Sequence, residues 1–294
     1  MQGQGRSHVK IGIFGINFGV CADPDAISEV AELAEELGFD SLWTGEHVVL
    51  PDPQAPPSPA PPLTPMLHPS TALAYVAAVT DEILLGTGIT LIAQRNPLVL
   101  AKEMASLDVL CDGRLILGIG AGYLKQEFDA LGIPFEERGR RTDEFIEVLR
   151  EMWSSDQPSF DGEFISFDGI QSRPRPARGD RLPIVAGGMS MAAYQRAVAS
   201  CQGWYGFAMD LETTSESLEG IEAAEERIDR PKWLGDLEIT VTPRETPTYE
   251  DLEAYASLGV DRLVLLLPQR SVGAVTEFLE RMAEELIDDE DDED

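Results

Sequence analysis

Short apolar runs alternate with longer amphipathic stretches along the chain, and this pattern indicates the fold class. The eight runs cover residues 9–16, 40–44, 83–91, 115–119, 183–186, 204–207, 237–241 and 262–267. Strand-like runs that alternate with helix-like stretches in this way predict an α/β fold, the (β/α)8 or TIM barrel. The active site of such a barrel lies where strands end and βα loops begin, so the segments after the runs are the candidate site.

The segments between the runs predict helices, with two interruptions. Apolar positions at helical spacing predict helices over residues 24–37, 98–110, 138–153 and 272–286. Residues 48–69, after strand two, hold nine of the 20 prolines, which predicts an irregular loop over the barrel mouth. Residues 156–182 are rich in Gly, Pro and Arg and include a hairpin-like aromatic piece; we interpret them as an insertion between strands four and five.

One barrel with one insertion accounts for the length of the chain without a second domain. We therefore expect a single TIM-barrel domain over residues 1–287. The remaining residues, 288–294, are all acidic, and we expect them to form a disordered tail.

The charge of the chain is strongly negative. There are 53 acidic residues against 22 basic ones, and leaving out the nine acids of residues 284–294 still leaves 44 against 22. Such a surface repels itself in dilute buffer, whereas molar salt shortens the Debye length to about 3 Å. We interpret the composition as an adaptation to a halophilic cytoplasm; the alternative is a merely acidic surface. The charge disfavours nucleic acid and anionic membranes as partners.

Cysteine and histidine usage also limits the function classes. Cys21, Cys111 and Cys201 are widely spaced and odd in number, which favours reduced thiols in a cytoplasm. The chain has only three histidines, and we expect no metal site. The first residues show no apolar signal segment, and no apolar stretch is long enough for a membrane helix.

The segment Gly187-Gly188-Met189-Ser190 ends a strand run and precedes a helix pattern. Paired glycines let the backbone approach a ligand closely, and a helix N-terminus attracts anions. The segment is therefore a candidate phosphate site. A tight turn capped by Ser190, without a ligand, is the alternative.

Glycines also cluster in strands three and four. Residues 118–122 read Gly-Ile-Gly-Ala-Gly, and the third glycine comes too early for a dinucleotide-binding fingerprint. They would leave a flat shelf for a planar ring; the alternative is small-residue packing at a strand end. Gly86 and Gly88 inside strand three predict a bulge or a close approach by another group.

Polar residues follow strand two. His47, preceded by Glu46, is the one histidine at a strand end, where it could donate to a cofactor or relay a proton near pH 7. The alternative is a structural histidine beneath the proline-rich loop.

Two further sets of residues have two interpretations each. Trp43 and Trp204 either line the barrel mouth or fill the core. The arginines in 173–181 either hold an anionic cofactor tail or form a solvated face.

In their order and spacing, these motifs resemble the luciferase-like monooxygenase superfamily, in its branch of oxidoreductases that depend on coenzyme F420, a deazaflavin. The motifs that carry the resemblance are Lys102 and the stretches 10–14, 33–43, 46–47, 85–89, 95–97, 107–108, 112–122, 127–128, 131–132, 135–138 and 183–188. They cover roughly residues 9–205, and the final third of the chain matches only as barrel.

The resemblance implies a flavin-type ring across the barrel mouth. By position, Gly88 and Ile89 match the family's non-prolyl cis peptide, which backs and bends the ring. Catalytic roles fall to His47, beside the reactive edge, and to Glu46, and cofactor contacts fall to Gly88, Ile89, Gly120, Ala121, Gly187, Gly188, Met189 and Ser190. The family also implies a homodimer.

We therefore expect an enzyme that transfers hydride between F420 and an unidentified organic substrate. An FMN-dependent monooxygenase with O2 and a reductase partner is one alternative, and a non-catalytic flavin-binding barrel is another. Tyr123 stands where the sugar-phosphate dehydrogenases of this branch carry Glu, and their substrate-phosphate lysines have no obvious counterparts here, so we discount that substrate. Glu46 stands where Asp is common.

Overall fold

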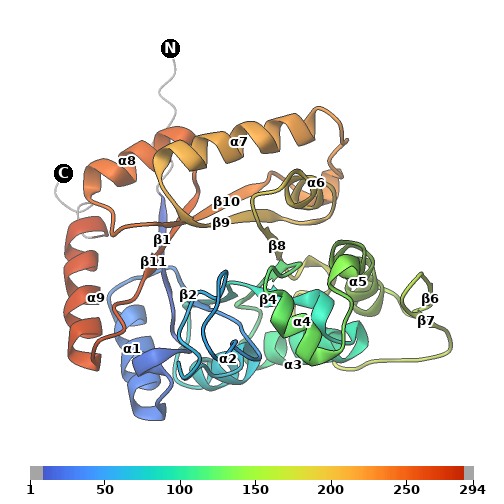
Figure 1. Cartoon of the computed structure of the whole chain (residues 1–294), viewed down its shortest axis with the longest axis horizontal. Helices are drawn as coiled ribbons and strands as arrows, with labels where there is room; N and C mark the ends of the chain where they lie inside the picture. Colours follow the sequence, from blue (N-terminus) through green and yellow to red (C-terminus); the bar gives the residue numbers. More distant parts are fainter. Residues whose placement is uncertain (1–8, 288–294) are drawn as a thin grey trace.

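Strands and helices alternate along residues 9–287, the part of the chain described by the computed structural model (Figure 1). The strands are β1 (Lys10–Phe14), β2 (Ser41–Thr44), β3 (Leu84–Thr87), β4 (Thr90–Leu91), β5 (Leu115–Gly120), β6 (Phe160–Asp161), β7 (Ser166–Phe167), β8 (Ile184–Gly187), β9 (Gly203–Met209), β10 (Glu238–Pro243) and β11 (Arg262–Leu266). The α-helices are α1 (Pro24–Glu36), α2 (Pro69–Ala77), α3 (Pro97–Leu110), α4 (Lys125–Leu131), α5 (Arg138–Ser154), α6 (Met191–Ser200), α7 (Leu211–Glu225), α8 (Tyr249–Leu258) and α9 (Val272–Leu286). The expected acidic tail, 288–294, lies outside the described residues.

The parallel strands close into a barrel with helices around it (Figure 1). Their order is β3, β2, β1, β11, β10, β9, β8, β5, β4, and β3 also pairs with β5, which closes the ring. Both β3 and β4 pair with β5, and only residues 88 and 89 separate them, so together they form the third barrel strand. The predicted TIM barrel is confirmed.

Local sequence signals place the helix starts. Asp23 accepts hydrogen bonds from the first turn of α1, Asn96 does so for α3 with Pro97 next to it, and Ser190 caps α6. These side chains satisfy N–H groups that have no acceptor within the helix. The four helices predicted from periodicity are present, with ends that differ from the prediction by at most one residue.

Apolar side chains form a layer between strands and helices and a smaller cluster inside the barrel. The inner cluster consists of Phe14, Trp43, Ile116, Val185, Tyr205 and Val264. Trp43 and Trp204 are fully buried, so both fill the core and do not line the mouth. A Cβ at Gly86 would lie 2.4 Å from the Trp43 ring, and the glycine therefore makes room for the indole.

An ion-pair cluster closes the amino-terminal floor of the barrel. Arg262, at the start of β11, is 1% exposed and donates to Asp40 Oδ2 at 2.6 Å and to Glu238. Lys10 approaches the same Glu238 carboxylate at 3.3 Å. Burial alone would lower the pKa of Arg262, but the two carboxylates outweigh it and raise that pKa. These contacts lie at the end opposite the strand carboxyl termini and serve stability.

The chain between β5 and β8 carries α4, α5 and a small hairpin. The predicted aromatic hairpin is confirmed, because β6 and β7 pair antiparallel, and it projects beyond α5 (Figure 1). Arg178 donates to the carbonyl of Leu115, the first residue of β5, and Arg175 pairs with Asp156 after α5. These two arginines therefore hold loops at the amino-terminal end of the barrel, and not a cofactor tail at the mouth.

Two further findings concern the described residues. Within 9–287, no helix combines the length and the apolar composition that crossing a membrane requires. All three cysteines are free and buried. Burial raises the pKa of Cys21 to about 11 and that of Cys201 to about 12, so both thiols stay protonated at neutral pH.

Candidate active site

Exposed apolar side chains gather where the barrel strands end. Tyr123, after β5, is 50% exposed, Phe207 on β9 is 45% exposed and Leu266 at the end of β11 is 36% exposed. The buried side-chain atoms Thr44 Oγ1 and Gln94 Oε1, which belong to the same end of the barrel, have no hydrogen-bond partner within the described residues. Apolar surface with a few free polar atoms at a barrel mouth is typical of a ligand site.

Asn17 ties the loops of this mouth together. Its amide accepts from the N–H of Gly45 at 2.9 Å and donates to the carbonyls of Gly45 and Leu67 at 2.9 and 2.7 Å. The side chain is fully buried, and both of its bonds with Gly45 are shielded from water. One residue thereby joins the ends of β1 and β2 to the far end of the proline-rich loop.

The proline-rich loop, residues 48–69, is attached near both of its ends. Near its start, the N–H of Val48 donates to Glu127 Oε1 at 2.5 Å. Near its end, Pro65 accepts from Gly19 at 2.9 Å and the Met66 sulfur accepts from the N–H of His47. The middle of the loop is exposed, with Leu63 at 89%. The loop is therefore fixed at two edges of the mouth.

The bulge in the third strand explains three glycines. The Gly88–Ile89 peptide bond is cis, as the resemblance implied. A Cβ at Gly120 would lie 2.1 Å from Ile89 Cδ1, one at Gly187 would lie 2.8 Å from the same atom, and one at Gly118 would lie 1.9 Å from the Thr87 carbonyl oxygen. The expected shelf is therefore partly filled, since the glycines on β5 and β8 make room for the Ile89 side chain.

The turn between β8 and α6 is open to solvent. Gly188 has φ = +118°, a conformation that favours glycine. Trp204 Nε1 donates to its carbonyl at 2.8 Å, which fixes the turn, and residues 188–190 are exposed. Ser190 Oγ accepts from Ala193, so the predicted cap is present. The remaining N–H groups of the first turn of α6 have no acceptor in the helix and can meet an anion.

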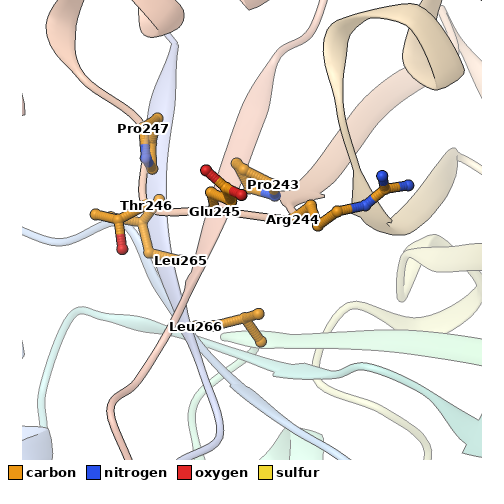
Figure 2. Close-up of a pocket in the computed structure, with 7 residues that line it drawn as sticks. All are labelled: Pro243, Arg244, Glu245, Thr246, Pro247, Leu265 and Leu266. Atoms are coloured by element: carbon orange, nitrogen blue, oxygen red, sulfur yellow. The ribbon is translucent and has the colours of Figure 1, made fainter.

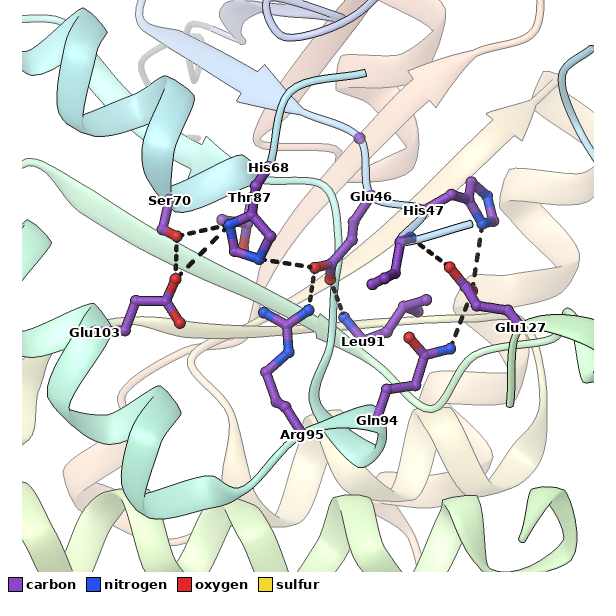
Figure 3. A network of polar contacts seen from close by, with 12 residues as sticks. Glu46, His47, His68, Ser70, Thr87, Leu91, Gln94, Arg95, Glu103 and Glu127 are labelled. Atoms are coloured by element: carbon purple, nitrogen blue, oxygen red, sulfur yellow. Dashed lines mark hydrogen bonds and ion pairs between the residues drawn. The ribbon is translucent and has the colours of Figure 1, made fainter. Parts of the chain in front are cut away.

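His47 lies between an exposed hydroxyl, that of Tyr123, and a buried carboxylate, that of Glu127. Figure 3 shows its contact with the carboxylate. Its Nε2 lies 3.3 Å from the Tyr123 hydroxyl, and its Nδ1 lies 3.4 Å from Glu127 Oε2. The second contact is an ion-pair approach and not a well-aligned hydrogen bond. Glu127 is fully buried and also accepts from Gln94 at 3.0 Å.

The carboxyl of Glu127 is held in its charged form. Burial alone would raise its pKa, but the contacts from His47 and Gln94, followed by the N–H of Val48, outweigh burial and lower that pKa. For Tyr123, burial and then the negative charge of Glu127 raise the pKa of the phenol. At neutral pH the cluster therefore presents a carboxylate and a protonated hydroxyl on opposite sides of one imidazole.

Glu46 and His47 are neighbours in sequence but face different partners (Figure 3). The Glu46 carboxylate is buried, where it accepts from the N–H of Leu91 at 2.6 Å and from Arg95. His68 Nε2 lies 3.8 Å from the same carboxylate. Glu46 thus joins β2, the third barrel strand and the start of α2, and its charge is paired below the mouth surface.

Glu127, Gln94 and Tyr123 were not among the predicted site residues. A signal for Glu127 was available, because Leu124, Glu127 and Phe128 have helical spacing and form the buried side of α4. A carboxylate on the apolar side of a short helix needs a partner, and that partner is His47. Within residues 9–287, no cluster of three or more His, Cys, Asp or Glu side chains is arranged for a metal.

A cavity of about 180 Å³ lies at the ends of β10 and β11 (Figure 2). It is lined by Pro243, Arg244, Glu245, Thr246, Pro247, Leu265 and Leu266. The Arg244 side chain points away toward β9 and α7, where it pairs with Asp210 at 2.9 Å. None of the predicted site residues lines this cavity, which extends the rim beside Leu266.

A family model described as luciferase-like monooxygenase matches residues 3–285. The chain belongs to this family. A relative from Mycobacterium tuberculosis, described as an uncharacterized protein, is 29% identical over 267 residues, which cover 87% of this chain and 92% of the relative. The F420-dependent glucose-6-phosphate dehydrogenase of Amycolatopsis mediterranei is 28% identical, over 90% of this chain and 78% of that enzyme.

Two further likenesses bear on the cofactor and the fold of this luciferase-like protein. The FMNH2-dependent dimethylsulfone monooxygenase of Pseudomonas fluorescens is 35% identical, but over 53% of this chain and 41% of the enzyme. The structure of the coenzyme F420-dependent tetrahydromethanopterin reductase of Methanopyrus kandleri matches with a TM-score of 0.75 at 17% identity, over 95% of this chain and 99% of that one. At this identity the structural match shows the fold alone.

Proposed function

We propose that this luciferase-like protein is an F420-dependent oxidoreductase that transfers hydride between the deazaflavin and an organic substrate. The observation that carries the proposal is the make-up of the mouth. An exposed apolar face, which includes Tyr123 and Phe207, lies at the same end of the barrel as an open helix N-terminus at Ser190 and a polar group at His47. The apolar face suits a planar ring, the helix N-terminus suits an anionic tail, and the polar group suits the exchange of a proton. The F420-dependent relatives support the proposal.

The residues present fit such a cofactor. Gly188 and the first turn of α6 would take a phosphate, since their N–H groups are open and a side chain at 188 would hinder the approach. Met189 is 61% exposed beside this turn. The bulge at Gly88–Ile89, together with Gly120 and Ala121, would lie along the ring. When bound, the deazaflavin supplies the chemistry of hydride exchange.

The protein side of the chemistry is binding, orientation and proton handling. We propose that His47 exchanges a proton or orients the reacting groups at the mouth, because it connects an exposed hydroxyl to a buried carboxylate. For Glu46 we propose a positioning role, because its carboxylate is buried and paired with Arg95. Its contact with the N–H of Leu91 holds the third strand immediately after the bulge.

FMN is the second candidate cofactor, because the Pseudomonas relative uses reduced FMN. The two cofactors share a ring outline, and the same mouth would hold either one. With FMN the expected reaction is an oxygen-dependent monooxygenation that needs a reductase partner.

The surface charge supports a further proposal about the environment. Net charge at pH 7 is −31, which favours a protein that works in molar salt, inside a halophilic cytoplasm. A homodimer remains part of the proposal through family membership. Sedimentation in low and in molar KCl tests the oligomeric state and its salt dependence together.

Cofactor binding in roughly molar KCl tests the proposed function, since salt at that level screens the surface charge. Purified protein is titrated with F420 and, separately, with FMN, and ring fluorescence is followed. Micromolar or tighter binding of F420 with weak FMN binding supports the proposal. A preference for FMN supports the monooxygenase alternative instead. If the protein binds neither F420 nor FMN, both proposals are contradicted.

A further inference from the structure

The Tyr123 hydroxyl is the outermost group of the cluster around His47. Tyr123 follows the glycines at the end of β5, and half of its surface is exposed. Its hydroxyl lies 3.3 Å from His47 Nε2, and the two rings meet edge-on with centroids 5.9 Å apart. A ligand above the strand ends would therefore meet this hydroxyl, whereas the His47 side chain is only 9% exposed.

The opposite nitrogen of His47 faces a fixed charge. Glu127 comes from the first turn of α4, and its carboxylate is held by the N–H of Val48 and by Gln94 in addition to His47. The other neighbours of His47 carry no charge toward it: the Met66 sulfur contacts its backbone N–H, and the adjacent Glu46 is paired with Arg95. A carboxylate next to Nδ1 keeps the proton of a neutral imidazole on that nitrogen. Nε2 is then free to accept from the Tyr123 hydroxyl.

We propose that Tyr123, His47 and Glu127 form a proton relay in which Tyr123 is the catalytic residue that touches the substrate, His47 passes the proton on, and Glu127 is a positioning residue that fixes the tautomer of His47. The inference rests on the proposed function, which supplies the hydride partner. The relay suits an alcohol/carbonyl pair, because such a pair exchanges one proton at oxygen for each hydride exchanged at carbon.

The relay balances protons and electrons. In the oxidative direction, the substrate hydroxyl proton passes to the Tyr123 oxygen as the Tyr123 proton passes to His47 Nε2, and the C–H electron pair leaves as the hydride taken by the oxidised deazaflavin. In the reductive direction, protonated His47 returns its Nε2 proton to Tyr123, which protonates the carbonyl oxygen, and the hydride comes from the reduced deazaflavin. Solvent restores the protonation of His47 in both cases.

The tautomer of His47 in the ligand-free protein tests the relay. Protein labelled with 15N-histidine gives few imidazole signals, because the chain has three histidines, and H47Q and H68Q identify those of His47 and His68. Neutral wild-type His47 is expected to carry its proton on Nδ1. Tyr123→Phe should shift the Nε2 resonance and keep the tautomer, whereas Glu127→Gln should move the proton toward Nε2. Tyr75→Phe, at a 45% exposed tyrosine on α2, is the matched control and should change neither.

Two results overturn the relay: a wild-type His47 protonated on Nε2, or an Nε2 resonance that Tyr123→Phe leaves unchanged. Both measurements use proteins whose buried residues are intact, so they decide the question even if Glu127→Gln does not fold. F420 titration of wild type and of the Tyr75→Phe control runs beside them, with equal affinity expected. Loss of binding in both proteins contradicts the proposed function alone, because the tautomer is measured without cofactor.

Discussion

The packing of Ile89 against Gly120 yields a stability prediction that a double-mutant cycle can test. Gly120→Ala places a Cβ 2.1 Å from Ile89 Cδ1 and 3.2 Å from its Cγ1, with nothing else within 4 Å. Overpacking of this kind costs about 1–3 kcal/mol of unfolding free energy. Ile89→Val removes Cδ1 and costs about 0.5–1.5 kcal/mol when made alone. In the double variant the 2.1 Å contact disappears and only the 3.2 Å contact is left, so its loss should fall below the summed single losses by about 1 kcal/mol.

Equilibrium urea unfolding in about molar KCl measures these free energies, at a salt level set by the screening argument. Tryptophan fluorescence and far-UV circular dichroism should give coincident transitions before two-state values are compared. Gly118→Ala is the matched control, because its Cβ would lie 1.9 Å from a backbone oxygen, that of Thr87, and Ile89→Val cannot relieve that contact. Strict additivity for Gly120→Ala with Ile89→Val, or rescue of Gly118→Ala by Ile89→Val, would refute the reasoning.

Four further predictions follow from the same structure. Arg262→Leu leaves two carboxylates without their buried partner and should lower the free energy of unfolding by about 3 kcal/mol, which urea titration measures. Burial would raise the pKa of Glu35, but N–H donors from Ile83, Glu82 and Asp81, helped by Arg114, lower it. Because the folded pKa lies below the unfolded one, Glu35 stabilises the fold above the unfolded pKa, and that contribution is lost as pH falls through the folded pKa. Glu35→Gln should therefore be less stable than wild type at pH 7 but not in acid, and a constant difference in melting temperature would contradict this. His47→Ala should lower turnover about 10²–10⁴-fold while F420 affinity in fluorescence titration stays near wild type; unchanged turnover removes His47 from the chemistry. F420 affinity should hold or improve as KCl rises, and a steep loss with salt in the same titration would contradict the screening argument.

The barrel was predictable because its information is local and repeated. Each strand is a short apolar run, and each helix that we predicted carries its own periodicity and, for α1 and α3, its own cap. The register between neighbouring strands, by contrast, cannot be inferred from any local sequence pattern. The meeting of Ile89 with glycines on β5 and β8 depends on that register, so the sequence showed the glycines without their common partner.

The sequence predicted where the candidate site residues lie in the barrel, but not which side chains contact one another there. Strand ends located His47 and the 187–190 turn, and the resemblance located the bulge at Gly88–Ile89. Neither signal showed that Glu46 and Glu127 belong to two separate polar clusters. The direction of each side chain after β2 is set by contacts with segments distant in sequence, and a local pattern does not reveal these contacts. The arginines in 173–181 were equally ambiguous, since composition does not tell which end of a barrel a loop occupies.

The proline-rich loop is anchored by residues near its two ends, and its middle takes no part in this attachment. The fixed contacts involve its first two residues and residues 65–67, and they are made by Glu127, Asn17, Gly19 and His47. The chain between these anchors can therefore be exchanged, shortened or recoded without touching the parts that hold it over the mouth. For engineering, residues 51–63 are therefore a suitable site for a library of variants, in which the loop beside the mouth is redesigned for new substrates while the barrel keeps its geometry.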